Sequence, residues 1–322
     1  MGGSNPMGKN FSATLLKWYG KNQRPLLWRQ TSNPYHILVS EIMLQQTQVA
    51  RVLEKFPLFL RQFPTLERLA HAPPAEVIKA WSGMGYNRRA LLLQRFAQEV
   101  LEKHDGEIPR DPKVLYTLPG IGPYTAGALA AFAYNHPEPA IDVNVRRIFL
   151  RYFQGKDQGL PQGTKQEGKL YKLVKSSIPQ GKSREFHNTL MDFGSLVCTR
   201  ETPSCGKCLL QSSCRFYPLY RKRGEKALFH RPPRQEPGTY EKGKFVPNRI
   251  FRGRLVEWVR KNEDQEISVT TLGKVIKEDF TGKEKRWLIS LCQGLQKEKL
   301  LFYTCNHQKI CFRLSPSPAK SL

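Results

Sequence analysis

The sequence of 322 residues has few acidic side chains and no long apolar run. It contains 27 Asp and Glu against 52 Lys and Arg, which gives a formal net charge of +25. Because a membrane-spanning helix needs about 20 consecutive apolar residues, we expect no membrane partner. The N-terminus has no charged segment followed by an apolar one, so we expect neither a secretory signal nor a secreted, disulfide-bonded protein.

The excess of positive charge predicts a polyanionic partner, most simply nucleic acid. A basic protein that associates with ribosomes, or that binds polyanions without specificity, would have the same composition. The charge is dense over residues 215–250, which hold 10 Lys and Arg but only 3 Asp and Glu, together with several Pro and Gly. We therefore interpret residues 215–249 as a basic linker between domains.

Helical spacing of apolar residues predicts a mainly α domain over residues 10–214. Hydrophobic residues make up 39% of the chain, which is enough for a core. Gly and Pro separate the helical segments, and no alternating strand pattern is sustained before residue 250. The segments with helical spacing are 11–18, 37–52, 88–101, 124–132, 143–153 and 186–197.

Residues 250–315 have a different pattern, which predicts three helices followed by a β-hairpin. Segments 250–260, 270–280 and 283–296 have helical character, and two short strand-like segments follow at 300–304 and 310–314. This order is typical of a winged-helix-like module. Its third helix would carry three basic residues able to face DNA, namely Lys283, Lys285 and Arg286. A protein-interaction or purely packing module is an equally good interpretation.

Four of the seven cysteines are spaced C-x6-C-x2-C-x5-C, and they are Cys198, Cys205, Cys208 and Cys214. Four thiolates in so short a stretch can close around one metal centre, and iron–sulfur clusters are held by such sets. Zinc is an alternative, although its usual pattern has two close Cys pairs and this chain has one. We expect a 4Fe–4S cluster rather than zinc or a disulfide, with Cys292, Cys305 and Cys311 as reduced thiols.

The string LPGIGPYTAG, residues 118–127, opens an apolar helix. Gly120 and Gly122 let the backbone turn sharply and approach a ligand closely. The helix N-terminus offers free N–H groups to a phosphate. With a first helix near residues 112–117, the string resembles a helix–hairpin–helix motif, so Gly120, Gly122 and Thr125 are candidate DNA contacts.

Asp142 lies about twenty residues after the hairpin, just before another predicted helix. An acid at such a place is more often an N-cap than a catalytic group. The hairpin, this aspartate and the four-Cys loop, in this order, nevertheless resemble the endonuclease III superfamily. Within it, the chain is most similar to the adenine DNA glycosylase family. The strings that match it are LWR at 27–29, SEIMLQQTQV at 40–49, WSGMGY at 81–86 and LMDFG at 190–194.

The resemblance covers about residues 10–214 and implies a fold of two helical lobes. The six-helix lobe would span about 30–136, and the cluster lobe would combine the N-terminal helix with about 137–214. It also implies a monomeric base-excision repair enzyme that acts on double-stranded DNA with a mispair or lesion. Such an enzyme would work in the cytoplasm at the nucleoid, or in the nucleus of a eukaryote.

Glu41 matches the family's general acid, which protonates the departing adenine. Its apolar neighbours would raise its pKa by desolvation; a solvent-facing helix residue is the alternative. Asp142 matches the carboxylate that stabilises positive charge on the sugar, and Tyr124 and Asn144 match neighbours that orient it. Because bifunctional relatives have a Schiff-base Lys where this chain has Tyr124, we expect little or no lyase activity.

Further matches concern the base pocket and the DNA surface. In the base pocket, Trp28 and Arg29 match family residues. Asn188 also falls there, but the family has a Gln or Glu at its place, so we expect different base contacts. Residues expected to enter the base stack or lie beside it are Leu44, Gln45, Gln46, Thr47, Met84 and Tyr86. Family members often have a second Tyr after the first, and this chain has Asn87 instead. The candidates for phosphate contacts are Arg88, Arg89, Arg146 and Arg147.

Residues 215–322 do not resemble the Nudix-like C-terminal domain with which typical members recognise 8-oxoguanine. We therefore expect an adenine glycosylase acting on mispairs with 8-oxoguanine or G, and the opposite base stays open. One alternative is a thymine or uracil mismatch glycosylase, because relatives with Tyr at position 124 remove pyrimidines. A non-catalytic iron–sulfur DNA-binding protein is the other, although a binder needs no pair of carboxylates facing a polyanion.

Overall fold

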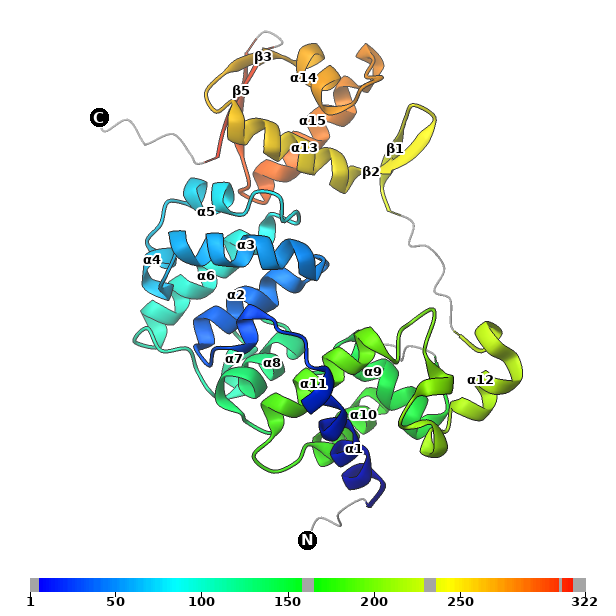
Figure 1. The fold of residues 1–322 in the computed structure, drawn as a ribbon. Coiled ribbons are helices and arrows are strands. Elements are labelled where there is room, and N and C mark those ends of the chain that lie inside the picture. Colours follow the sequence, from blue (N-terminus) through cyan, green and yellow to red (C-terminus); the bar gives the residue numbers. More distant parts are fainter. Residues whose placement is uncertain (1–5, 158–164, 229–235, 307–308, 315–322) are drawn as a thin grey trace. The chain divides into compact units, whose positions relative to one another are not determined.

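The computed structural model describes residues 6–157, 165–228, 236–306 and 309–314, and its fold is mainly α-helical (Figure 1). The chain divides into two units, each built from two separate stretches: Met1–Glu41 with Ile108–Pro232, and Ile42–Glu107 with Pro233–Leu322. The lobes expected from the sequence divide the chain at other places and stay a prediction. In the described part of the chain, no helix is long and apolar enough to cross a membrane.

The described residues of the first unit form helices joined by loops, without a strand. Its aromatic core joins the N-terminal helix to the middle of the chain: Phe11 lies edge-on to Phe149, with ring centroids 5.3 Å apart, and Phe149 stacks on Phe153. The elements are α1 (Pro6–Asn22), η1 (Leu27–Arg29), α2 (Pro34–Leu44, whose end enters the second unit), α7 (Pro112–Leu115), α8 (Pro123–Tyr134), α9 (Val143–Phe149), η2 (Leu150–Gln154), α10 (Lys165–Ser177), α11 (Ser183–Leu196), η3 (Cys205–Lys207), η4 (Gln211–Ser213), α12 (Tyr217–Arg223) and η5 (Gly224–Ala227).

The second unit combines four helices with a C-terminal module. The helices are α3 (Val49–Gln62), α4 (Leu66–Ala70), α5 (Pro74–Ala80) and α6 (Arg88–Lys103). After a hairpin, β1 (Gly238–Glu241) with β2 (Lys244–Pro247), the module has α13 (Asn248–Lys261), β3 (Glu266–Ser268), α14 (Val269–Ile276), η6 (Gly282–Glu284), α15 (Lys285–Lys297), β4 (Phe302–Asn306) and β5 (Lys309–Arg313). Its antiparallel sheet has the order β3-β5-β4. The predicted winged-helix-like order is therefore confirmed.

The module shares an apolar core with α5 and α6. Ile78 of α5 is fully buried, and Leu91 of α6 is 7% exposed, and both belong to the same core as Phe251, Leu255 and Val259 of α13. An apolar contact of this kind stabilises an arrangement in proportion to the area removed from water. The module is therefore packed on these two helices through a shared apolar core.

Three features differ from the sequence-based expectations. The expected helix 37–52 is broken after Leu44, because Gln46 has a left-handed backbone (φ 57°). The stretch expected as a linker contains α12 and the β1–β2 hairpin, although we expected no strand before residue 250. Lys283 belongs to η6, so only Lys285 and Arg286 begin α15. Periodicity misses such features because they are short.

Candidate active site and DNA-facing loops

Glu41 is a carboxyl group buried in the first unit, near the end of α2. Only 6% of its surface is exposed, and Val39 and Ile42, which are close to it in the sequence, are also buried. The hydroxyl of Tyr124, from the first turn of α8, donates to Oε2 of Glu41 at 2.7 Å. Burial raises the pKa of Glu41 to about 7, the hydrogen bond from Tyr124 opposes this rise, and the charge of Asp142 adds to it. Glu41 can therefore hold a proton near neutral pH.

Asp142 is the second carboxyl group of this site and the N-cap of α9. Its Oδ1 accepts the backbone N–H of Val145 at 2.7 Å, and its Oδ2 accepts Nδ2 of Asn144 at 2.8 Å. Burial raises the pKa of Asp142, while these two hydrogen bonds lower it. Both interpretations weighed for this residue are thus compatible, since it caps a helix and also lies near enough to Glu41 to affect its pKa.

The structure gives Tyr124 a different partner from the one expected. We expected Tyr124 and Asn144 to orient Asp142. Asn144 does so, but the single hydroxyl proton of Tyr124 is donated to Glu41. Because a phenol has only one proton to donate, Tyr124 orients the acid and Asn144 orients the carboxylate.

A chain of hydrogen bonds connects Asp142 to the backbone of the four-Cys loop. Arg147, considered as a phosphate contact, instead donates Nη2 to Oδ1 of Asn144 and to the carbonyl of Gly194, each at 2.7 Å. Its Nε donates to the carbonyl of Cys198 at 2.8 Å. A Cβ atom on Gly194 would lie 2.6 Å from that of Asn144. Gly194 therefore leaves room for the side chain that orients Asp142.

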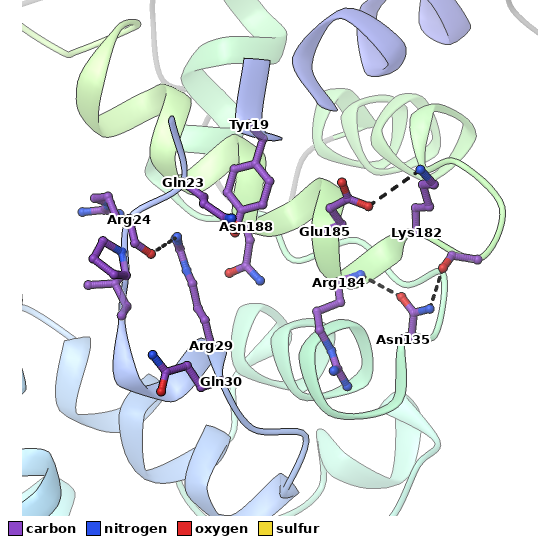
Figure 2. A pocket seen from close by; sticks show the side chains of 13 residues that line it. Tyr19, Gln23, Arg24, Arg29, Gln30, Asn135, Lys182, Arg184, Glu185 and Asn188 are labelled. Carbon is purple, nitrogen blue, oxygen red and sulfur yellow. Dashed lines mark hydrogen bonds and ion pairs between the residues drawn. The ribbon is translucent and has the colours of Figure 1, made fainter. Parts of the chain in front are cut away.

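A cavity of about 770 Å³ opens in the same unit beside Arg29 and Asn188, two of the expected base-pocket residues (Figure 2). Trp28, the third, is 7% exposed and does not line this cavity. Asp192, which sequence reasoning left without a role, holds Arg29 by two hydrogen bonds of 2.7 Å. Burial raises the pKa of Asp192, but hydrogen bonds from Arg29 and Arg24 outweigh it and keep the pKa below its usual value.

Two stretches of the second unit, residues 44–47 and 84–88, carry most of the side chains expected to contact DNA. Gln46 and Tyr86 both have a left-handed backbone, with φ of 57° and 46°. Both are exposed, Tyr86 by 44%, and so is Arg88. Gln45, Leu44 and Thr47 are half-buried. Met84 is only 4% exposed, so the structure does not present its side chain to a ligand.

Arg89 is buried and connects these two stretches by hydrogen bonds to both. It was considered as a phosphate contact, but it is 8% exposed and its guanidinium lies 5.4 Å from the ring centre of Trp81 and 5.5 Å from that of Tyr86. Such a buried fork satisfies the free carbonyls at the end of α2. Its acceptors are the carbonyls of Ile42, Met43, Gln45, Met84 and Gly85 and the hydroxyl of Thr47.

The helix–hairpin–helix motif is formed by α7, the turn and α8. Gly120 is exposed and has φ of 76°, a conformation that favours glycine. Gly122 is the N-cap of α8, and a Cβ there would contact nothing within 4 Å. Thr125 is only 3% exposed, so its side chain does not face a ligand. The two glycines therefore leave an open approach to the start of α8.

The four clustered cysteines line one small cavity with Arg151 and Phe216. None of the four is disulfide-bonded in the structure. Arg151, held by Asp157 at 2.6 Å, places Nη1 3.5 Å from Sγ of Cys198. Among the residues described, no three His, Cys, Asp or Glu side chains are placed to hold a single metal ion.

This fold, with a helix–hairpin–helix and paired carboxyl groups, defines a class of base-excision enzymes. The family described as HhH-GPD superfamily base excision DNA repair protein matches residues 39–175. An adenine DNA glycosylase from Mycobacterium tuberculosis (strain CDC 1551 / Oshkosh) is 38% identical over 77% of this chain and 78% of its own. The chain therefore belongs to the adenine DNA glycosylase family of this superfamily.

Pyrimidine-specific relatives are also similar. The thymine/uracil-DNA glycosylase of Methanothermobacter thermautotrophicus is 32% identical over 66% of this chain and 96% of its own. A solved structure of a thermostable thymine-DNA glycosylase has a TM-score of 0.62 at 31% identity, and covers 66% of this chain and 97% of that one. The helical domain is thus common to both branches.

The burial of Glu41 predicts a measurable dependence of stability on pH. Its pKa is about 7 when folded, against an ordinary value of 4.5, so the folded protein binds the extra proton between these two values. Stability should therefore fall as pH rises from 4.5 to 7. The E41Q variant lacks this titration. Its free energy of unfolding should gain, relative to wild type, on the order of 3 kcal/mol between pH 4 and pH 8.

Denaturant unfolding across this pH range measures the difference. E201Q, which changes an exposed carboxylate of the four-Cys loop, should follow wild type. Parallel curves for E41Q and wild type would show that Glu41 ionises normally in the folded protein.

Proposed function

We propose that the chain is a monofunctional DNA glycosylase that removes adenine from mispairs, opposite 8-oxoguanine or G. The observation that carries the proposal is the buried Glu41, whose pKa of about 7 lets it act as an acid, with Asp142 as a separate carboxylate. Membership of the adenine DNA glycosylase family supports the same substrate.

Glu41 would supply the proton that makes adenine a good leaving group. Adenine departs poorly as an anion, so protonation of a ring nitrogen lowers the barrier. Tyr124 occupies Oε2 of Glu41 as a donor, which leaves Oε1 to carry the transferable proton. The acid is thus fixed in orientation as well as in protonation state.

Asp142 would stabilise the positive charge that develops on the sugar as the bond breaks. Its two oxygens are held by Val145 and Asn144, so the charge is placed before the reaction and does not need to reorganise. Water then completes hydrolysis. Tyr124 stands where a Schiff base would need an amine, and its hydroxyl is committed to Glu41, so no strand cleavage is expected.

The target adenine must leave the stack before it can react. Exposed Tyr86 and Gln46 are proposed to fill the gap, with Arg88 on the backbone. The N-terminus of α8, opened by Gly120 and Gly122, would bind a phosphate. We propose that the enzyme acts as a monomer wherever chromosomal DNA lies, at the nucleoid or in a nucleus.

Single-turnover base release from four duplexes tests the function: A opposite 8-oxoguanine, A opposite G, T opposite G and U opposite G, each with and without alkali. We expect release of adenine with strand breaks only after alkali. D142N should lose at least about 100-fold in rate, yet keep the helix cap and DNA binding, because Asn caps as well as Asp.

Three results would contradict parts of the proposal. Release of thymine or uracil without adenine would move the chain to the pyrimidine branch. Loss of DNA binding in D142N, parallel to the loss of activity, would show that Asp142 is structural. Strand cleavage without alkali would refute the absence of lyase activity.

A 4Fe–4S cluster is proposed for the four-Cys cavity. The donor set fits, because four free thiols line one cavity and such clusters take four Cys ligands. The spacing favours the cluster over zinc, because the usual zinc pattern has two close Cys pairs and this chain has one. The cluster would fix the loop whose Cys198 carbonyl accepts from Arg147, and the hydrolysis needs no electron from it.

Iron and acid-labile sulfide content tests the cluster. Anaerobically purified protein should contain close to four of each per chain. C208S should lose most of both, whereas C305S, which changes an exposed thiol elsewhere, should retain them. One zinc per chain without sulfide would refute the cluster and support the zinc interpretation.

A further inference from the structure

Helix α13 of the C-terminal module is hydrogen-bonded to the Ser82–Asn87 loop, which carries Tyr86. Glu257 accepts the hydroxyl of Ser82 at 2.9 Å and the backbone N–H of Gly83 at 3.3 Å. Loop and helix are more than 170 residues apart in sequence and belong to the same unit.

Arg260, one helical turn further on, completes the contact. Its Nη2 donates to the carbonyl of Ile78 at 2.7 Å and to Oδ1 of Asn87 at 3.0 Å, and its Nη1 pairs with Glu257. The Arg260 side chain is only 5% exposed. Its Nε is buried without a hydrogen-bond partner among the described residues. A buried guanidinium is costly to desolvate, so its two terminal nitrogens are committed to this contact.

The loop needs such support because its backbone is unusual. Gly83, Gly85 and Tyr86 all have positive φ, of 79°, 65° and 46°. For a bulky residue such as Tyr86 this conformation costs free energy and persists only when the surroundings enforce it. Arg89 holds the middle of the loop through the carbonyls of Met84 and Gly85, and α13 contacts the loop at both ends.

Asn87 is a position at which this chain departs from its family, and the contact with α13 gives a reason for the difference. Family members often have a second Tyr at this place, whereas Asn87 is buried, 8% exposed, and accepts from Arg260. The short amide side chain supplies the acceptor that α13 requires. The loop and the module are therefore matched to each other.

A groove of about 560 Å³ lies between the loop and the module. Tyr86 and Arg88 line it from the loop side, and Arg249, Ile250 and Arg252 line it from α13. Arg249 pairs with Glu236 at 2.8 Å and Arg252 with Glu298 at 2.7 Å. The shape of the surface beside Tyr86 therefore depends on α13 as well as on the loop.

We propose that Glu257 and Arg260 are positioning residues that hold the Tyr86 loop in the conformation that unstacks the target base. The proposal rests on the proposed function. It makes the C-terminal module a part of the base-flipping apparatus, acting through the loop and not by touching the reacting atoms. Breaking the contact should slow base extrusion and leave the chemistry on an already extruded base intact.

Two substrates separate these steps in the full-length protein. In one, the target adenine is stacked opposite G; in the other, it lies opposite an abasic site and is already poorly stacked. For R260M and E257Q we expect about a 10-fold slower single-turnover release from the first and less than a 2-fold change on the second. R260K, which keeps the charge, should recover part of the loss. S82A removes one hydrogen bond and gives a gentler variant if R260M does not fold.

K261M is the matched control, since Lys261 is the exposed neighbour on the same helix. It should behave as wild type on both substrates. Equal losses on both substrates, or no loss on either, would overturn the proposal. A 2-aminopurine beside the target base reports unstacking without chemistry, and its signal on binding should be smaller in R260M than in wild type. If wild type released no adenine from either duplex, the proposed function would fail, and this signal would still decide the positioning role.

Discussion

The proposed chemistry depends on the removal of the Glu41 carboxyl group from water. A carboxyl group on the surface would be ionised at neutral pH and could donate no proton. Glu41 is buried in α2, and this burial raises its pKa to about 7. Tyr124 partly offsets this rise while it fixes the orientation of the carboxyl group. The hairpin proposed to bind a phosphate thus also supplies the hydrogen-bond partner of Glu41.

The second carboxyl group depends on a longer chain of contacts. Asn144 orients Asp142, Arg147 orients Asn144, and the same guanidinium binds the carbonyl of Cys198. Gly194 is small because a side chain there would displace Asn144. The backbone of the four-Cys loop can therefore influence the orientation of Asp142. A structural role of this kind would explain why a hydrolytic enzyme has a cluster that takes no part in electron transfer.

Local patterns were sufficient to predict the helical fold and the winged-helix-like order, because both depend on neighbours in sequence. They also suggested the burial of Glu41, although its hydrogen-bond partner Tyr124 is distant in the sequence. The roles of Arg89, Asp192 and Arg260 could not be predicted, since their partners lie far away in the chain or are backbone carbonyls. A motif match also does not separate side chains that face DNA from those that fill the core. Met84 and Thr125 are therefore buried although their motifs suggested contacts.

The pH dependence of single-turnover adenine release shows directly whether Glu41 donates the proton. If Glu41 is the buried acid, the rate constant should be high at low pH and fall as pH rises through about 7. Y124F should move this fall to higher pH, because the hydrogen bond from Tyr124 lowers the pKa of Glu41. A rate constant that is independent of pH between 5 and 9 would contradict the role of Glu41 as the proton donor. A fall that Y124F moves to lower pH would contradict the effect of Tyr124 on its pKa.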